Sequence, residues 1–278
     1  MASYIHPFCG RTHRHPKWGV KTNSNPLSNL QAETIDGVLL SLDRVIEWSK
    51  QNSSRLGYFA ALYRKVTRAV KAGIADGSFE DGPRMERLDV IFANRYLDAL
   101  ERYQTDRAST PQAWRLAFET AEQWWPIVLQ HLLLGMNAHI NMDLGIAAVG
   151  CAPPGELAGV KGDFFKINGI LASLVQETQK ELTEVWPWLA LLDRFVGKSD
   201  EGLTNVGMWL TRGHAWLLAE ELALLPTDAQ SVRITALDRD VADLGRLLVP
   251  PGRLLRVLLW LVRMGELRFV PTIIEILE

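Results

Sequence analysis

Apolar side chains recur at helical spacing along most of the chain, and the alternating pattern of a half-buried strand is scarce. The clearest case is residues 56–72, where apolar side chains fall on one face and basic side chains on the opposite face. The same periodicity predicts helices at residues 38–50, from Arg84 onward, 111–125, 127–150, 163–182, 203–225, 235–248, 251–264 and 270–277. We therefore expect an all-α fold: a single multi-helix domain of about nine helices over residues 34–278, built around the central 127–150 helix.

Residues 1–33 lack this periodicity and carry several prolines, which predicts an irregular N-terminal arm. The arm also holds His6, Cys9, His13 and His15, whose side chains are of the types that zinc prefers as ligands. Their spacing matches no standard zinc finger. We therefore favour an extended polar arm over a metal site.

The segment at residues 132–150, LLLGMNAHINMDLGIAAVG, is as apolar as a buried helix except for four polar side chains. At about 100° per residue, His139 and Asp143 share one face of this helix. Asn137 and Asn141 share another face, turned roughly 160–200° away. Buried polar groups need partners, so both faces mark either a functional site or a hydrogen-bonded scaffold, and the sequence leaves these alternatives open.

Other polar side chains fall on predicted buried stripes. Asp89 lies within the apolar arc of the third predicted helix, and Tyr63 lies in the apolar face of residues 56–72. Further along the chain, the polar residues expected to point inward are Asn168, Arg212, His214, Trp216 and Glu221. A buried Glu or Arg nearly always requires a partner. The arc opposite Asp89 has the composition of a solvated face; its residues are Arg87, Asn94, Arg95, Asp98 and Arg102.

Composition narrows the classes of function. The 278 residues include 30 basic and 32 acidic side chains, so the net charge of −2 gives no field that attracts nucleic acid. The two cysteines, Cys9 and Cys151, indicate no disulfide scaffold, and no secretory signal is visible, so we expect a cytoplasmic protein. The His, Asp and Asn residues within 127–150 make membrane insertion costly, so we expect no stable insertion. The oligomeric state is not predicted.

Several segments together resemble a bacterial domain family of unknown function that is all-helical. They are DGV at 36–38, LY at 62–63 with VT at 66–67, GSFED at 77–81, LDVIFAN at 88–94 and, above all, GMNAHINMDL at 135–144. Asp163 with Asn168, and Ala215-Trp216 with Ala219, continue the likeness over roughly residues 35–278. The resemblance implies one helical domain and draws attention to these residues, but the family has no established reaction to transfer.

A single divalent metal is one interpretation of the central polar cluster. His139 and Asp143, one turn apart, could supply two ligands on one helix. Asp89, His214 or Glu221 could then complete the shell. The remainder of a His-rich zinc pattern is absent from the sequence, so at most one metal is expected.

Acid–base chemistry without a metal is the second interpretation. Asp143 would hold the tautomer of His139 and raise its basicity. Tyr63, Asn137 or Asn141 would bind a developing oxyanion. In a third, purely structural interpretation, Asp143 only orients His139 and the asparagines tie helices together. Motifs of serine hydrolases, phosphate-binding loops and dinucleotide-binding folds are absent from the sequence.

A small-molecule enzyme is the leading hypothesis for function. It acts on a largely apolar substrate in a pocket between helices, with His139 as base or metal ligand and Asp143 as the group that orients it. The candidate ligand-binding residues are Asn137, Asn141, Asn168, His214 and Trp216. The alternative is a non-catalytic binding protein or carrier for a hydrophobic ligand, since ten tryptophans could line an apolar cavity.

Overall fold

The computed structural model describes residues 25–152, 155–185, 200–249, 259–260, 262–266 and 269–278. Within these ranges the regular elements are all helices, so the expected all-α fold is confirmed. The α-helices are α1 Ile35–Gln51, α2 Leu56–Ala75, α3 Gly82–Thr105, α4 Gln112–Ala121, α5 Val128–Ala138, α6 Leu144–Cys151, α7 Lys161–Val185, α9 Asp200–Leu224, α10 Thr227–Leu248 and α12 Val270–Leu277. Two short 3-10 helices, η1 Arg107–Ser109 and η3 Leu157–Val160, and one π-helix, η2 His139–Asp143, complete them.

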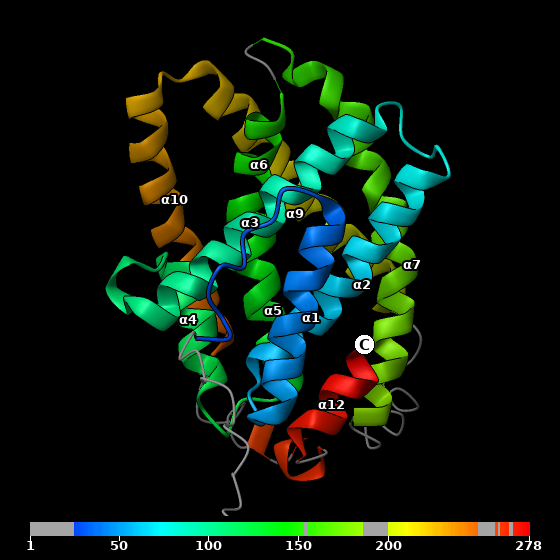
Figure 1. Cartoon of the computed structure of the whole chain (residues 1–278), viewed down its shortest axis with the longest axis vertical. Coiled ribbons are helices and arrows are strands. Elements are labelled where there is room, and N and C mark those ends of the chain that lie inside the picture. Colours follow the sequence, from blue (N-terminus) through cyan, green and yellow to red (C-terminus); the bar gives the residue numbers. More distant parts are fainter. Residues whose placement is uncertain (1–24, 153–154, 186–199, 250–258, 261, 267–268) are drawn as a thin grey trace, which may run out of the picture.

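The central segment lies in the middle of the fold, as expected. Helices α5, η2 and α6 follow one another without a break and are flanked by α2, α3, α4, α9 and α10 (Figure 1). Helix α1 packs on α2 and α3, and α12 packs on α1, α2 and α7. In this view α10 stands at one edge of the molecule and α7 at the opposite edge. The polar cluster of the central segment therefore lies among helices on all sides.

Several helix boundaries differ from those predicted. Helix α3 begins at Gly82 because the Asp81 carboxylate accepts the Arg84 N–H at 2.9 Å and caps the first turn. Helix α4 ends at Ala121, four residues before the predicted end at 125. Helix α10 begins at Thr227, eight residues before the predicted start, directly after Pro226. The helix predicted at 251–264 falls largely outside the described residues.

The described part of the N-terminal arm packs against the helical domain. Leu27 and Leu30 are fully buried. The Asn94 side chain accepts the Ala32 N–H at 2.8 Å and donates to the Ala32 carbonyl at 2.7 Å. The interpretation of Asn94 as part of a solvated face was therefore wrong, because this amide holds an extended segment against α3. The cluster of His6, Cys9, His13 and His15 lies outside the described residues.

Two glycines allow the central segment to approach its neighbours closely. A Cβ atom on Gly135 would lie 2.4 Å from the Phe59 ring, and one on Gly145 would lie 2.7 Å from the Ala215 carbonyl oxygen. Real Cβ contacts are never that short, so only glycine lets α2 and α9 come this near. Phe59 is thereby placed against α5, beside the polar cluster.

One described helical run, Val128–Cys151, satisfies the length and composition of a membrane span, with a mean hydropathy of 1.3. Of its most apolar stretch, 67% is buried inside the fold. The central helix of a folded core meets the same criteria.

Candidate functional site

The carboxylate of Asp143 is the centre of the polar cluster. It is fully buried and accepts two hydrogen bonds from other helices. The Arg95 Nε atom of α3 donates to Oδ1 at 2.7 Å, and the Trp114 indole Nε1 of α4 donates to Oδ2 at 2.8 Å. These bonds join η2 to α3 and α4, and they compensate the cost of burying a negative charge.

His139 lies one turn before Asp143 on the same face, as the sequence predicted. Its Nδ1 atom faces Oδ2 of Asp143 at 3.4 Å, and the side chain is 3% exposed. A carboxylate beside Nδ1 favours the tautomer in which Nδ1 carries the proton, which leaves a lone pair on Nε2. The Nε2 atom is buried and has no hydrogen-bond partner among the described residues. Such an unpartnered buried nitrogen requires an explanation.

The two residues lie in the single π turn of the described chain, where the Leu144 N–H bonds to the carbonyl of His139. A π turn inserts one extra residue into a helix and occurs most often at functional positions. The polar His139–Asp143 face and the local departure from α-helical geometry therefore coincide.

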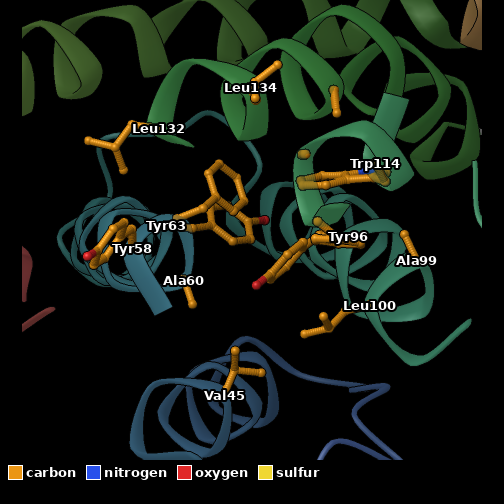
Figure 2. Packing of buried hydrophobic residues seen from close by; sticks show 14 of the residues in the cluster. Val45, Tyr58, Ala60, Tyr63, Tyr96, Ala99, Leu100, Trp114, Leu132 and Leu134 are labelled. Carbon is orange, nitrogen blue, oxygen red and sulfur yellow. The ribbon is translucent and has the colours of Figure 1, made fainter. Parts of the chain in front are cut away.

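Aromatic rings surround the His139 imidazole. The Phe92 ring stacks on it with centroids 3.5 Å apart and planes at 8°, and the Tyr63 ring meets it edge-on at 4.5 Å. Three further rings lie around the imidazole: those of Phe59, Tyr96 and Trp114, whose centroids are 5.7, 6.4 and 5.8 Å from that of His139. Figure 2 shows Tyr63, Tyr96 and Trp114 reaching from three helices into the same space.

These surroundings keep the imidazole neutral. Burial lowers the pKa of His139 below its ordinary value of 6.5, and this outweighs the opposite effect of the neighbouring Asp143 carboxylate. Tyr63 stays protonated, because burial and the nearby Asp89 and Asp143 carboxylates raise its pKa. The Tyr63 hydroxyl makes no hydrogen bond of standard geometry to a described residue, although the Thr67 side chain lies close enough to oppose the rise of its pKa.

Asp89 is buried on α3, as predicted, at 6% exposure. Its Oδ2 atom has no partner among the described residues. Burial, with a smaller contribution from the Glu86 carboxylate, raises the pKa of Asp89 to about 7. This carboxyl group therefore changes its protonation state near neutral pH.

The asparagine face of the central helix is separate from this site. The Asn137 amide donates to the Val241 carbonyl of α10 at 2.8 Å, and its oxygen accepts from the Asn141 amide at 2.9 Å. The two residues therefore tie α5 and η2 to α10, as the structural interpretation predicted. Their predicted role as oxyanion or ligand-binding groups beside His139 has no geometric support.

The remaining predicted ligand-binding residues lie elsewhere. Trp216 is buried on α9 and donates to the Glu220 carboxylate at 2.5 Å. Asn168 lies on α7, with a buried and unpartnered side-chain oxygen. His214 is exposed, so the prediction that it points inward was wrong. None of these three has a described contact with the His139 ring.

The donor groups do not fit a metal ion. Both oxygens of Asp143 accept N–H groups, one of them from a guanidinium cation that repels a metal. Of the expected third ligands, His214 and Glu221 are exposed, and Glu221 pairs with Arg233 at 2.7 Å. Within the described ranges no three His, Cys, Asp or Glu side chains lie close enough together to bind one metal. The sequence hypothesis of a divalent metal on His139 and Asp143 thus lacks a complete ligand set.

A recess adjoins the aromatic surround of His139. Its enclosed part measures about 20 Å³, enough for one water molecule, and it opens to solvent. Phe59, Tyr96 and Trp114 line it and also contact His139. Arg55 and His131 provide polar groups in the same wall. A single layer of rings therefore separates the recess from the imidazole.

Sequence reasoning missed the two donors that hold Asp143. Arg95 was grouped with the solvated arc of α3, and Trp114 was not singled out within the predicted 111–125 helix. The only available signal was the need of a buried carboxylate for partners. That requirement does not say which of the 30 basic residues supplies one.

These features define an all-helical protein with a buried imidazole–carboxylate pair at a π turn of its central helix. The sequence model described as "Family of unknown function (DUF5995)" matches residues 35–251, so the chain belongs to this family. Comparison with curated proteins and with solved structures gave no match.

Proposed function

We propose that this protein is an enzyme that transfers a proton to or from a small, largely apolar substrate, with Nε2 of His139 as the general base. The observation that carries the proposal is the pairing of a carboxylate-oriented, neutral imidazole with an Nε2 atom that has no hydrogen-bond partner in the described part of the chain. A general base needs its free lone pair at working pH, and the lowered pKa of His139 supplies it.

The neighbouring groups suit this role. Asp143 is the positioning residue: held by Arg95 and Trp114, it fixes the imidazole and stabilises its charged form after proton uptake. The protonated Tyr63 hydroxyl is a donor for negative charge that develops on the substrate. Asp89, whose pKa of about 7 allows it to give or take a proton, lies near enough to Tyr63 to affect its pKa.

The substrate class follows from the walls around the base. Rings of Phe59, Phe92 and Trp114 surround the imidazole, so a substrate at Nε2 meets mainly apolar surface. Phe59 and Trp114 also line the adjoining recess. The substrate would reach His139 from this recess by displacing one of the shared rings, which makes side-chain movement part of the reaction.

The test is a reaction screen in D₂O. Small apolar ketones, esters and carboxylic acids are incubated with wild-type protein, His139→Gln and Asp163→Asn, and mass spectrometry follows consumption and deuterium uptake. Asp163→Asn is the control, because Asp163 is also a fully buried carboxylate but binds the Glu80 and Asp81 N–H groups instead.

Wild type and Asp163→Asn should convert or label the same compound, and His139→Gln should do so at least about 100-fold more slowly, the usual contribution of a general base. Equal rates in wild type and His139→Gln would refute the proposal. A compound that binds wild type in native mass spectrometry without any conversion or labelling would identify the carrier alternative instead.

A further inference from the structure

The recess beside the active-site rings carries polar groups that the proposed proton transfer does not use. It lies where the first turns of α2 and α5 meet the end of α4, and its polar lining residues are Arg55, His131 and Tyr96. His131 is 6% exposed, and neither of its ring nitrogens makes a hydrogen bond of standard geometry to a described residue, although the Pro126 carbonyl lies close enough to act on the ring. The Nε atom of Arg55 is also buried and unpartnered.

Arg55 lacks a counter-ion. Its single described side-chain hydrogen bond is a 3.5 Å contact from Nη1 to the Ala121 carbonyl, and within the described ranges no carboxylate lies within ion-pair distance. The nearby Glu266 is occupied, since it accepts from Arg263 at 3.0 Å and from the Val128 N–H at 3.0 Å. Among the described residues, no carboxylate therefore pairs directly with the Arg55 guanidinium, although Glu266 acts on it at longer range.

The rest of the wall is apolar. Leu56, Phe59, Trp114 and Phe118 line it, together with small alanines of α4. A guanidinium beside such a wall matches a molecule with a planar anionic group at one end and an apolar body at the other. The first turns of α2 and α5 add partial positive charge that favours an anion.

We infer that this recess binds the carboxylate of a small aromatic or apolar acid, with Arg55 and His131 as the groups that recognise it. The inference rests on the proposed function, because it names the substrate class for the same site. Burial lowers the pKa of His131 to about 3, so its imidazole is neutral and offers one N–H donor to a carboxylate oxygen. A phosphate dianion fits less well, since Arg263 is already paired with Glu266.

The orientation follows from the shared rings. With its carboxylate at Arg55, the apolar body of the acid lies along Phe59 and Trp114, the rings that also contact His139. The charged group is thereby held at the recess, and the other end of the molecule reaches the base once one of the shared rings moves aside. The binding energy of the carboxylate positions the reacting atoms without contributing to the proton transfer itself.

The test measures binding of benzoate, with benzamide as the neutral molecule of the same shape, by ligand-observed NMR titration. The proteins are wild type, Arg55→Gln, Arg55→Lys, His139→Gln and Arg233→Gln. Arg233 is a control arginine that pairs with Glu221 on the α9–α10 surface. Circular dichroism establishes that each variant is folded.

Benzoate should bind wild type at least 10-fold more tightly than benzamide does. Arg55→Gln should weaken benzoate binding at least 10-fold, Arg55→Lys less, and the control Arg233→Gln not at all; His139→Gln, which changes the other end of the site, should weaken it less than Arg55→Gln does. If Arg55→Gln does not fold, the inference is tested in wild type by magnetisation transfer from benzoate protons to Phe118 protons. Its absence, or equal benzoate affinity in wild type and folded Arg55→Gln, overturns the inference.

The two proposals fail separately. Benzoate binding that depends on Arg55, in a protein that converts no compound, leaves the carboxylate site in place and refutes the general-base proposal. Conversion of a compound that depends on His139, in a protein that does not bind benzoate, supports the general-base proposal and refutes the carboxylate site.

Discussion

The Nε atom of Arg95 donates to Oδ1 of Asp143 at 2.7 Å, although the two residues are 48 positions apart and lie on different helices. The Arg95 side chain is 28% exposed, whereas the Asp143 side chain is almost completely buried. This ion pair links the solvent-facing side of α3 to the centre of the fold. It offsets the free-energy cost of burying the Asp143 charge beside the His139 imidazole.

Removing the guanidinium should therefore destabilise the fold. Arg95→Leu leaves Asp143 with the Trp114 N–H and the longer contact to His139 but no cation, and should lower the free energy of unfolding at pH 7 by about 3–5 kcal/mol. The double variant Arg95→Leu/Asp143→Asn removes the buried charge and should recover at least half of this loss. Urea unfolding of both proteins measures the difference. A loss below about 1 kcal/mol for the single variant, as for an exposed pair, would contradict this role.

The close approach of Phe59 to Gly135 gives a second prediction. Gly135→Ala places a Cβ atom 2.4 Å from the Phe59 ring, which must shift, and should cost about 1–3 kcal/mol of stability. Gly169→Ala in α7 is the matched control, because its Cβ atom would meet no heavy atom within 4 Å. Helix propensity should make that control neutral or more stable by up to about 1 kcal/mol. Thermal unfolding that ranks the two variants in the opposite order would refute the prediction.

Asp89 predicts how stability depends on pH. Its folded pKa of about 7 is above the ordinary value of 3.8, so the folded state holds a proton that the unfolded state has released. Its favourable contribution is present below about pH 4 and is lost as pH rises through 7, by on the order of 4 kcal/mol. Asp89→Asn, which cannot ionise, should therefore gain stability relative to wild type between pH 4 and pH 8.

The stability of Asp163→Asn relative to wild type should depend on pH in the opposite direction. Burial raises the pKa of Asp163, but the N–H groups of Glu80 and Asp81 and the Lys166 ammonium outweigh it, so the pKa is lowered. Its ionised form stabilises the fold above about pH 4, and the deficit of the variant should disappear as pH falls through the folded pKa. Denaturant unfolding at several pH values measures both variants. A constant difference between Asp89→Asn and wild type would show that Asp89 does not titrate as described.

The asparagine face should contribute stability without affecting proton transfer. Asn137→Ala removes the bonds to the Val241 carbonyl and to Asn141, and should cost about 1–3 kcal/mol. Affinity for benzoate, and any rate that depends on His139, should stay within twofold of wild type. A rate loss comparable to that of His139→Gln would return Asn137 to the list of oxyanion donors.

The sequence predicted the fold and the centre of the site for identifiable reasons. The helical period of apolar residues predicted the helices, and the two polar faces of residues 132–150 placed His139 with Asp143 and Asn137 with Asn141. Asp89 and Tyr63 were also correctly placed inside. In each case the signal was a polar residue on a strongly apolar stripe.

The same reasoning failed where a helix is apolar on several sides. Helix α9 was expected to bury the stripe of His214 and Glu221, yet both are exposed, together with Leu217 at 61%. The other stripe is buried: Trp216 is 3% exposed, and Arg212 donates to the Phe164 carbonyl at 2.5 Å. When apolar residues occupy more than one face, periodicity alone does not select the buried one.

Arg95 escaped prediction for a different reason. It belongs by position to the polar arc of α3, and only its long side chain brings the guanidinium to Asp143. Side-chain reach of this kind depends on the tertiary arrangement of two helices, which residue spacing does not encode. The π turn at 139–143 is likewise absent from the residue pattern.

The protonation state of His139 tests its assignment as the general base most directly. It is measured by nitrogen NMR of ¹⁵N-histidine-labelled protein, with the signal assigned through His139→Gln. At pH 7 we expect a neutral ring with the proton on Nδ1 and a bare Nε2, and protonation only below pH 6.5, because burial lowers the pKa of His139. In Asp143→Asn the preference for the Nδ1 proton should weaken. A proton on Nε2, or a charged imidazole at pH 7, would contradict the assignment of His139 as the base.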